Sequence, residues 1–130
     1  MNTKLTAKLT NFHNALLRLK EAVEEFNQPD ASDVIRDGLI QRFEFTYELA
    51  WKTTKAYLED IGIVDINSPK AVIREAYAQR LLESEKSWIL MLNDRNMTSH
   101  MYKAEMAEAI ADRIANLYIK EFESLLDKLK

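Results

Sequence analysis

Apolar residues in the first 26 positions recur in alternating steps of four and three: Leu5, Leu9, Phe12, Leu16, Leu19, Val23 and Phe26. This spacing is typical of an amphipathic α-helix with a single buried stripe. The segment "NQPD" follows, and it ends the helix because Pro29 lacks an amide proton and restricts Gln28 to extended conformations. The pattern therefore predicts a first helix that ends shortly before Pro29.

A second, long helix is predicted from a cap at Asp30 or Ser32 to Gly62, a residue that suits the left-handed position after a helix end. Its apolar residues do not form one stripe. One face carries Ile35, Leu39, Phe43, Ala50 and Leu58, and a second set spreads around the helix as Ile40, Phe45, Leu49 and Ala56. A helix that is apolar on more than one side is buried on more than one side, at the centre of a bundle or against a second subunit.

Ser68 followed by Pro69 predicts the start of a third helix, with a side-chain cap and a proline at the first helical position. The pattern weakens around residues 83–85 and resumes as a short fourth helix at Trp88, Ile89, Met91 and Leu92. A last helix carries one apolar face, formed by Met106, Ile110, Ile114, Leu117, Leu125 and Leu129. With no strand candidate, the sequence predicts an all-α protein: one domain over residues 1–130, folded as an antiparallel up-down four-helix bundle with one short extra helix.

Composition narrows the classes of function. The chain has 130 residues, 47% of them hydrophobic, and no cysteine, which excludes disulfides and thiolate metal sites. No apolar run approaches the roughly 18 residues of a membrane span and no signal-like segment begins the chain, so we expect a cytoplasmic protein that contacts no membrane. The net charge of −3 argues against nucleic-acid binding by general phosphate neutralisation, so any contact with RNA must be local.

Familiar metal and phosphate motifs are absent from the sequence. A di-metal site in a helical bundle uses a Glu-x-x-His pair, and neither His13 nor His100 has a glutamate three positions before it. The two glycines, Gly38 and Gly62, cannot form a glycine-rich phosphate loop. We therefore expect no metal and no cofactor bound to this chain. The aromatic segment "FEFTYELAW" is interpreted as core or dimer interface, and Glu48 and Lys52 as a solvated helix pair.

The stretch "DRNMTSHMY", residues 94–102, concentrates reactive side chains near the predicted junction of the fourth and last helices. A continuous helix would point Arg95, His100 and Tyr102 in different directions. Thr98 and Ser99 favour turns and caps over helix interiors, so a break here would gather the three side chains at one end of the bundle. The alternative is that Thr98 or Ser99 simply caps the last helix while His100 and Tyr102 pack at its start.

The chemistry of the gathered set suits cleavage of an RNA phosphodiester without a metal. Histidine gives and takes a proton near neutral pH, and an arginine fork matches the charge of a phosphorane-like transition state. In this interpretation His100 activates the ribose 2′-hydroxyl and Arg95 stabilises the developing charge.

The spacing of Arg95, His100 and Tyr102, R-x4-H-x-Y, resembles the signature of the HEPN superfamily. Three blocks in the same order, "IQRFEFTYELAWKTTKAYLEDIG", "SPKAVIREAYAQ" and "MLNDRNMTSHMY", resemble the nucleotidyltransferase substrate-binding proteins of bacteria and archaea. The resemblance covers nearly the whole chain from about residue 10. It implies a HEPN-like helical bundle that forms a homodimer and is encoded beside a minimal nucleotidyltransferase, an enzyme that itself uses ATP and magnesium.

The resemblance also implies roles for single residues. Similar pairs act as toxin and antitoxin: the bundle protein cleaves RNA through the arginine and histidine of the motif, here Arg95 and His100. The nucleotidyltransferase silences it by attaching AMP to the motif tyrosine, here Tyr102. The neighbouring residues Asp94, Asn96, Thr98 and Ser99 would support these groups. Two other functions stay open: a non-catalytic nucleotide- or substrate-binding subunit of a split nucleotidyltransferase, and a structural dimer whose motif only shapes the helix junction.

Overall fold

Helices make up nearly all of the computed structural model, which describes residues 3–100 and 103–130. Within these residues there is no strand. The α-helices are α1 (Thr3–Phe26), α2 (Asp33–Asp60), α3 (Pro69–Ala78), α4 (Glu85–Met97), α5 (Ala104–Arg113) and α6 (Ile119–Leu129). A 3-10 turn, η1 (Thr98–His100), follows α4, and a π-helical turn, η2 (Ile114–Tyr118), joins α5 to α6.

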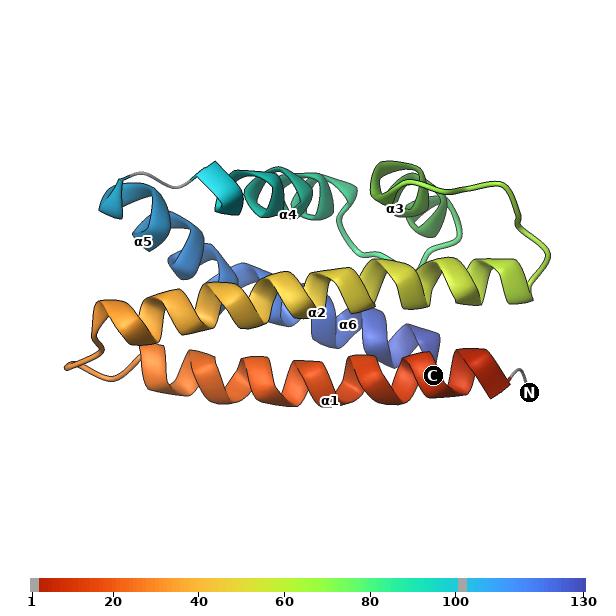
Figure 1. The fold of residues 1–130 in the computed structure, drawn as a ribbon. Helices are drawn as coiled ribbons and strands as arrows, with labels where there is room; N and C mark the ends of the chain where they lie inside the picture. The colour runs from red at the N-terminus through yellow and green to blue at the C-terminus, as the bar shows by residue number, and fades with distance from the viewer. Residues whose placement is uncertain (1–2, 101–102) are drawn as a thin grey trace.

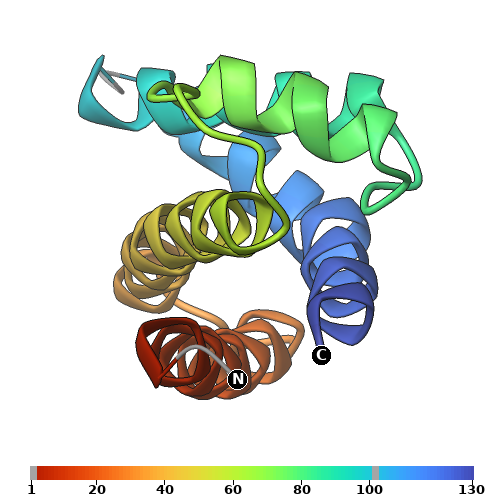
Figure 2. The ribbon, with the colours of Figure 1, turned by 90° about the vertical axis from the view of Figure 1, so that its right-hand side faces the viewer.

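The long helices form a bundle in which α1 and α2 run antiparallel side by side (Figure 1). The continuous segment α5–η2–α6 lies against them, and α3 and α4 lie on the side of α2 that faces away from α1 (Figures 1 and 2). Four aromatic side chains meet in the core, one from each bundle helix. Phe122 of α6 lies 6.2 Å from Phe12 of α1, 6.2 Å from Phe43 of α2 and 5.6 Å from Trp88 of α4, measured between ring centroids. The predicted four-helix bundle is confirmed, with α3 as the short extra helix.

Local sequence signals set most helix ends. The Ser32 hydroxyl, not the Asp30 carboxylate, caps α2 by accepting from the Ile35 amide at 3.3 Å. Ser68 caps α3 in the same way, with Pro69 as the first helical residue. Gly62 has φ +94°, the left-handed conformation that favours glycine after a helix. These three signals therefore predicted the ends of the second helix and the start of the third.

The last helix departs from the predicted single stripe. At η2 the chain makes a wider π turn, which holds one residue more than an α turn and shifts the phase of everything after it. The buried side chains are Ala107, Ile110 and Ala111 before the turn, Ile114 and Tyr118 within it, and Ile119, Phe122, Leu125, Leu126 and Leu129 after it. Of the predicted apolar face, Ile110, Ile114, Leu125 and Leu129 are buried, whereas Met106 and Leu117 are only partly buried, with Leu117 packed against the core.

Candidate functional site

The chain breaks its helical path between α4 and α5, as the sequence predicted. Helix α4 ends at Met97, η1 covers the next three residues, and Lys103 stands at the N-terminus of α5 with extended backbone and no side-chain cap. The alternative in which Thr98 or Ser99 caps the last helix is therefore wrong. Both residues belong instead to the turn that closes α4, where Ser99 Oγ donates to the Asn96 carbonyl oxygen at 3.2 Å.

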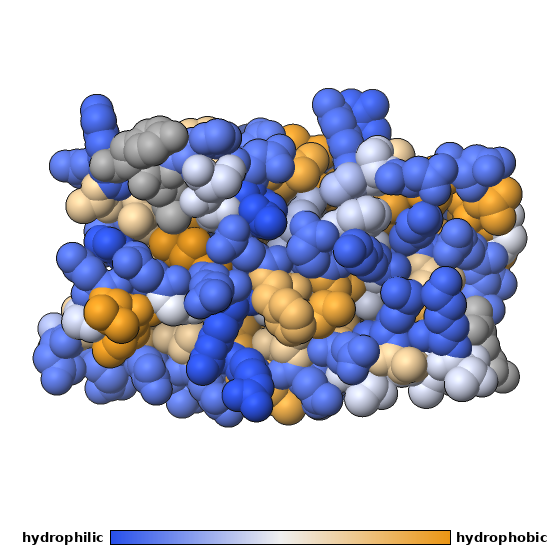
Figure 3. Space-filling model, in the orientation of Figure 1, coloured by the Kyte–Doolittle hydropathy of each residue, from blue (hydrophilic) through white to orange (hydrophobic). Residues whose placement is uncertain are grey.

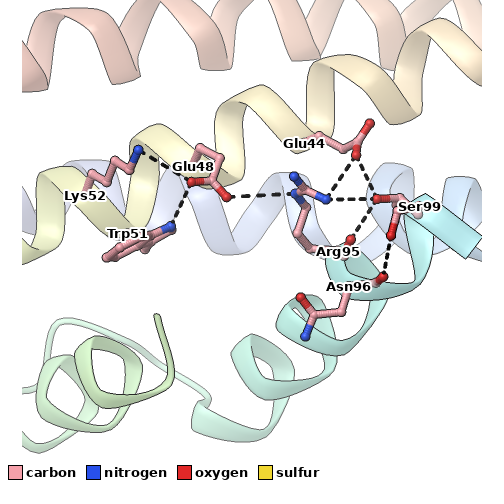
Figure 4. A network of polar contacts seen from close by, with 8 residues as sticks. Glu44, Glu48, Trp51, Lys52, Arg95, Asn96 and Ser99 are labelled. Atoms are coloured by element: carbon pink, nitrogen blue, oxygen red, sulfur yellow. Dashed lines mark hydrogen bonds and ion pairs between the residues drawn. The ribbon is translucent and has the colours of Figure 1, made fainter. Parts of the chain in front are cut away.

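Arg95 is held by groups from α2 and from the turn η1 (Figure 4). Its Nη1 lies 3.1 Å from Oε2 of Glu44 and donates to Oγ1 of Thr98 at 3.2 Å. Its Nε lies 3.9 Å from Oε1 of Glu48, outside hydrogen-bond distance. The Thr98 hydroxyl is itself 2.8 Å from Glu44 Oε2 and 2.7 Å from the Arg95 carbonyl oxygen. Thr98 thus supports Arg95 directly, and Arg95 Nη2 has no partner among the described residues.

The two glutamates of α2 engage their oxygens differently. In Glu48, Oε1 faces Arg95 without a hydrogen bond, and Oε2 accepts from Trp51 Nε1 at 3.2 Å and lies 3.7 Å from Lys52 Nζ. The predicted pair of Glu48 and Lys52 is confirmed, although the sequence did not show its link to Arg95. In Glu44 one oxygen, Oε2, lies 3.1 Å from Arg95 Nη1 and 2.8 Å from the Thr98 hydroxyl. The other oxygen, Oε1, points away from both residues (Figure 4).

Asp94 faces the opposite way from Arg95. Its carboxylate is buried and receives two hydrogen bonds from Arg113, from Nε at 2.7 Å and from Nη2 at 2.8 Å, and a third from the Tyr118 hydroxyl. The hydrogen bonds to Asp94 raise the pKa of Arg113, and burial, reinforced by Asp94, raises the pKa of Tyr118. Asp94 therefore ties α4 to α5 and η2, and the suggestion that it supports the Arg95 guanidinium is replaced by this contact.

His100 and Tyr102 complete the sequence motif. His100 is the last residue of η1 and its side chain is exposed. Tyr102 lies outside the described residues. The structure thus brings Arg95, in the last turn of α4, together with Thr98 of the turn η1, which also carries Ser99 and His100, and Asn96 contributes its backbone carbonyl to Ser99.

Sequence reasoning missed Glu44, and it placed Tyr47 in the core or an interface without predicting that its hydroxyl is unpaired among the described residues. Glu44 carries no local signal, because its partner Thr98 is 54 residues away in the chain. Tyr47 lies in the core, where its hydroxyl has no hydrogen-bond partner in the described part of the chain. Burial is the main cause that raises its pKa; the negative charge of Glu48 adds to the shift and the positive charge of Arg95 opposes it.

A groove lies between α1 and α2. This groove of about 590 Å³ is lined by Asn11, Asn14, Ala15, Arg18, Gln41, Arg42, Phe45, Thr46 and Leu49. Of the aromatic segment interpreted as core or interface, Phe43 and Tyr47 are in the core, whereas Phe45 is 63% exposed. Figure 3 shows an apolar patch over the middle of this face, surrounded by polar surface.

Neither a metal-ligand cluster nor a membrane-spanning helix is found in the described part of the chain. Residues 3–100 and 103–130 contain no group of three or more histidine, aspartate or glutamate side chains that could hold a metal ion. No helix formed by these residues combines the length and the apolar character that crossing a membrane requires.

Comparison with known proteins gives both a family and relatives. Residues 7–130 match the family called nucleotidyltransferase substrate binding protein like. A Haemophilus influenzae protein named probable ribonuclease HepT is 36% identical over 102 residues, which are 75% of this chain and 69% of that protein.

Solved structures share the fold. A protein from Thermus thermophilus is 37% identical, with a TM-score of 0.83, and the match covers 92% of this chain and 98% of that one. The tri-AMPylated HEPN toxin of Shewanella oneidensis, solved in complex with its MNT antitoxin, matches with a TM-score of 0.78 over 99% of this chain and 98% of that one. At 14% identity this second likeness shows a common fold only.

Proposed function

Because this chain belongs to the nucleotidyltransferase substrate binding protein like family, of the HEPN type, we propose that it is the toxin of a two-gene toxin–antitoxin module. In this proposal the chain is a metal-independent endoribonuclease, and its antitoxin is a minimal nucleotidyltransferase that uses ATP and magnesium. The observation that carries the proposal is the guanidinium of Arg95, which Glu44 and Thr98 hold in the last turn of α4, directly before the turn η1 that bears His100. The relative named probable ribonuclease supports the same reaction class.

The geometry suits phosphodiester cleavage in three respects. Arg95 is held by Glu44 and Thr98, and its Nη2, which has no hydrogen-bond partner among the described residues, can donate to a phosphate oxygen. His100, in the turn that follows α4, is exposed and can act as a proton-transfer group. In the reaction the ribose 2′-oxygen attacks the phosphorus and the 5′-oxygen leaves with a proton, giving a 2′,3′-cyclic phosphate.

We assign Tyr102 as the site of silencing. Its hydroxyl would attack the α-phosphate of ATP on the partner enzyme, forming a phosphotyrosine ester to AMP and releasing pyrophosphate. Tyr102 is two residues from His100 in the sequence, so the added nucleotide would fill the approach to the motif. Its negative phosphate would also compete with RNA for Arg95.

The test combines RNA cleavage with intact mass. Purified protein is treated with the neighbouring nucleotidyltransferase, ATP and magnesium. The intact mass of the treated and the untreated protein is measured by mass spectrometry, and both are then incubated with RNA in excess EDTA. We expect cleavage by the untreated protein and none by a His100→Ala variant. Treatment should add AMP units and abolish cleavage, whereas a Tyr102→Phe variant should gain no mass at this position and stay active after treatment.

Two results would contradict the proposal in different ways. If the untreated protein leaves RNA intact, the proposed ribonuclease activity is contradicted. The alternative is then favoured, in which the chain is a non-catalytic subunit that presents a substrate to the nucleotidyltransferase. That alternative is favoured by the family's own description and by the two glutamates that already neutralise Arg95. If cleavage persists after AMP has been added to Tyr102, only the proposed silencing by AMP is contradicted.

We also propose that the protein is a homodimer joined through the α1–α2 groove. Phe45 is the large exposed side chain in that groove, and an exposed apolar patch of this kind marks an interaction site. Light scattering should give twice the 15.1 kDa mass of one chain. Phe45→Ala should weaken the dimer, and Tyr77→Ala, which removes an exposed aromatic side chain from α3, should not. A monomer at every concentration would refute the dimer.

A further inference from the structure

Cleavage of RNA without a metal needs two proton transfers, one from the 2′-hydroxyl and one to the leaving 5′-oxygen. The described residues place one histidine, His100, in the turn beside Arg95. The other histidine, His13, is on α1 and lines a separate pocket with Lys20 and Glu123. The described residues of one chain therefore offer no second imidazole at the motif, so the second transfer falls to another side chain of the same chain or, in a homodimer, to His100 of the second copy.

We propose that Glu44 is a further catalytic residue: its free carboxylate oxygen is the general base that takes the proton of the ribose 2′-hydroxyl. The proposal rests on the ribonuclease function proposed above. Glu44 lies 3.1 Å from Arg95, which positions the phosphate, and its side chain is 31% exposed, so substrate can reach it.

The carboxylate of Glu44 is anchored at one end and open at the other. Oε2 lies 3.1 Å from Arg95 Nη1 and 2.8 Å from the Thr98 hydroxyl, which can donate to it. Oε1 has no partner among residues 3–100 and 103–130, and Figure 4 shows it directed away from the network. A general base needs this combination, because an anchored group keeps its orientation while its free oxygen accepts the proton.

Glu48 provides the contrast on the same helix. It also faces Arg95, but Oε1 points at the guanidinium and Oε2 is occupied by Trp51 and Lys52. Oε2 is thus engaged, and Oε1 faces the guanidinium at 3.9 Å without a hydrogen bond to it. Of the two carboxylates that flank Arg95, Glu44 is therefore the better placed to act as a base, because the oxygen that has no partner among the described residues points away from Arg95 and not at it.

In the proposed step, Glu44 Oε1 takes the 2′-hydroxyl proton as the 2′-oxygen bonds to phosphorus and the bond from phosphorus to the 5′-oxygen breaks. The His100 imidazolium gives its proton to the leaving 5′-oxygen, and Arg95 stabilises the charge on the non-bridging oxygens. The products are a 2′,3′-cyclic phosphate and a 5′-hydroxyl. Glu44 then releases its proton to water and His100 takes one up, which restores both side chains.

Two substrates separate the base from the acid. The first is a ribodinucleotide, and the second is uridine 3′-(4-nitrophenyl phosphate), whose nitrophenolate leaves without being protonated. We expect Glu44→Gln to lower kcat about a hundred-fold or more on both substrates, the usual effect of losing a general base. We expect His100→Ala to lose about as much on the dinucleotide but less than about ten-fold on the nitrophenyl ester.

Two more variants distinguish catalysis from positioning. The amide of the Glu44→Gln variant would keep an oxygen for Arg95 and Thr98, so a purely positioning role predicts that this variant stays active. It also predicts that Glu44→Asp, which shortens the side chain, is worse. The base role predicts the reverse order. Glu59→Gln, which changes an exposed glutamate on the same helix, is the matched control and should behave as the wild type. Thermal unfolding of each variant confirms that the fold is kept.

The outcomes do not overlap. Near-normal kcat for Glu44→Gln on both substrates would overturn the assignment of Glu44 and leave the ribonuclease intact. A loss confined to the dinucleotide would show that Glu44 serves the leaving group, and would also overturn it as the base. Wild-type protein that cleaves neither substrate would overturn the ribonuclease, and the role of Glu44 with it.

Discussion

Asp94 and Arg95 are neighbours in the chain and belong to two different polar networks. Asp94 points into the protein, where its carboxylate is buried and binds Arg113 and Tyr118. Arg95 points outward, where its side chain is 28% exposed and meets the carboxylates of α2. Consecutive residues of a helix project about 100° apart, so one turn of α4 serves both sides.

The two networks differ in how completely their groups are satisfied. Both oxygens of Asp94 are hydrogen-bonded, and the network joins α4 to α5 and η2. In the outer network Arg95 Nη2 and Glu44 Oε1 have no partner among the described residues. A closed, buried network stabilises a fold, whereas an open one leaves capacity for a ligand.

The sharpest test of this contrast is to delete each neighbour in turn. Asp94→Ala should lower the free energy of unfolding by about 3 kcal/mol, because it leaves the Arg113 guanidinium and the Tyr118 hydroxyl without their buried partner. Urea unfolding at one protein concentration, followed by circular dichroism, measures this change.

Arg95→Ala is the matched control for that deletion. It removes a partly exposed ion pair and should change the free energy of unfolding by less than about 1 kcal/mol. Equal losses for the two variants would show that the outer network also stabilises the fold, and the contrast between the two networks would fail.

Alkaline pH offers a smaller but independent test, through two buried tyrosines: Tyr118, which belongs to the inner network, and Tyr47. Burial raises the pKa of both Tyr118 and Tyr47 above the ordinary value of about 10. Above pH 10 the unfolded chain therefore loses these protons first, and stability falls as pH rises. At pH 11 each tyrosine should account for about 1 kcal/mol of lost unfolding free energy.

Phenylalanine variants separate the two tyrosines. Tyr118→Phe should cost about 1 kcal/mol even at pH 7, because it removes a hydrogen bond to Asp94. Tyr47→Phe should cost almost nothing at pH 7, since its hydroxyl has no hydrogen-bond partner in the described residues. In both variants the free energy of unfolding should fall less steeply above pH 10. If neither variant changes the steepness of this fall, other groups cause it.

What could be predicted from the sequence was mostly local. Ser32, Ser68 and Gly62 act within one turn of their own positions, so their roles can be recognised without a structure. The break after α4 followed from residues 98 and 99 in the same way. The arrangement of α4 against α2 could not be predicted, because Glu44 and Thr98 meet only through packing.

The inner network shows a different kind of limit. Placing Asp94 beside Arg95 invited the idea of a direct contact, although neighbours in a helix do not face each other. The actual partner of Asp94 is Arg113, which lies 19 residues further along the chain, in α5. Tyr118 also reaches Asp94, and it lies in the π turn η2, where the helix phase changes. The sequence prediction extended one helical period through the whole of the last helix. It therefore placed Leu117 on the apolar face, whereas the buried residue at this point of the structure is Tyr118.

The π turn at η2 also bears on chain length among relatives. It holds one residue more than the α turn it replaces, while the buried faces before and after it are both fixed by the bundle. Removing one residue between Ile114 and Tyr118 would restore a regular helix and leave both faces in register. In an alignment of homologous chains, this is the place inside a helix where a single-residue gap does least harm.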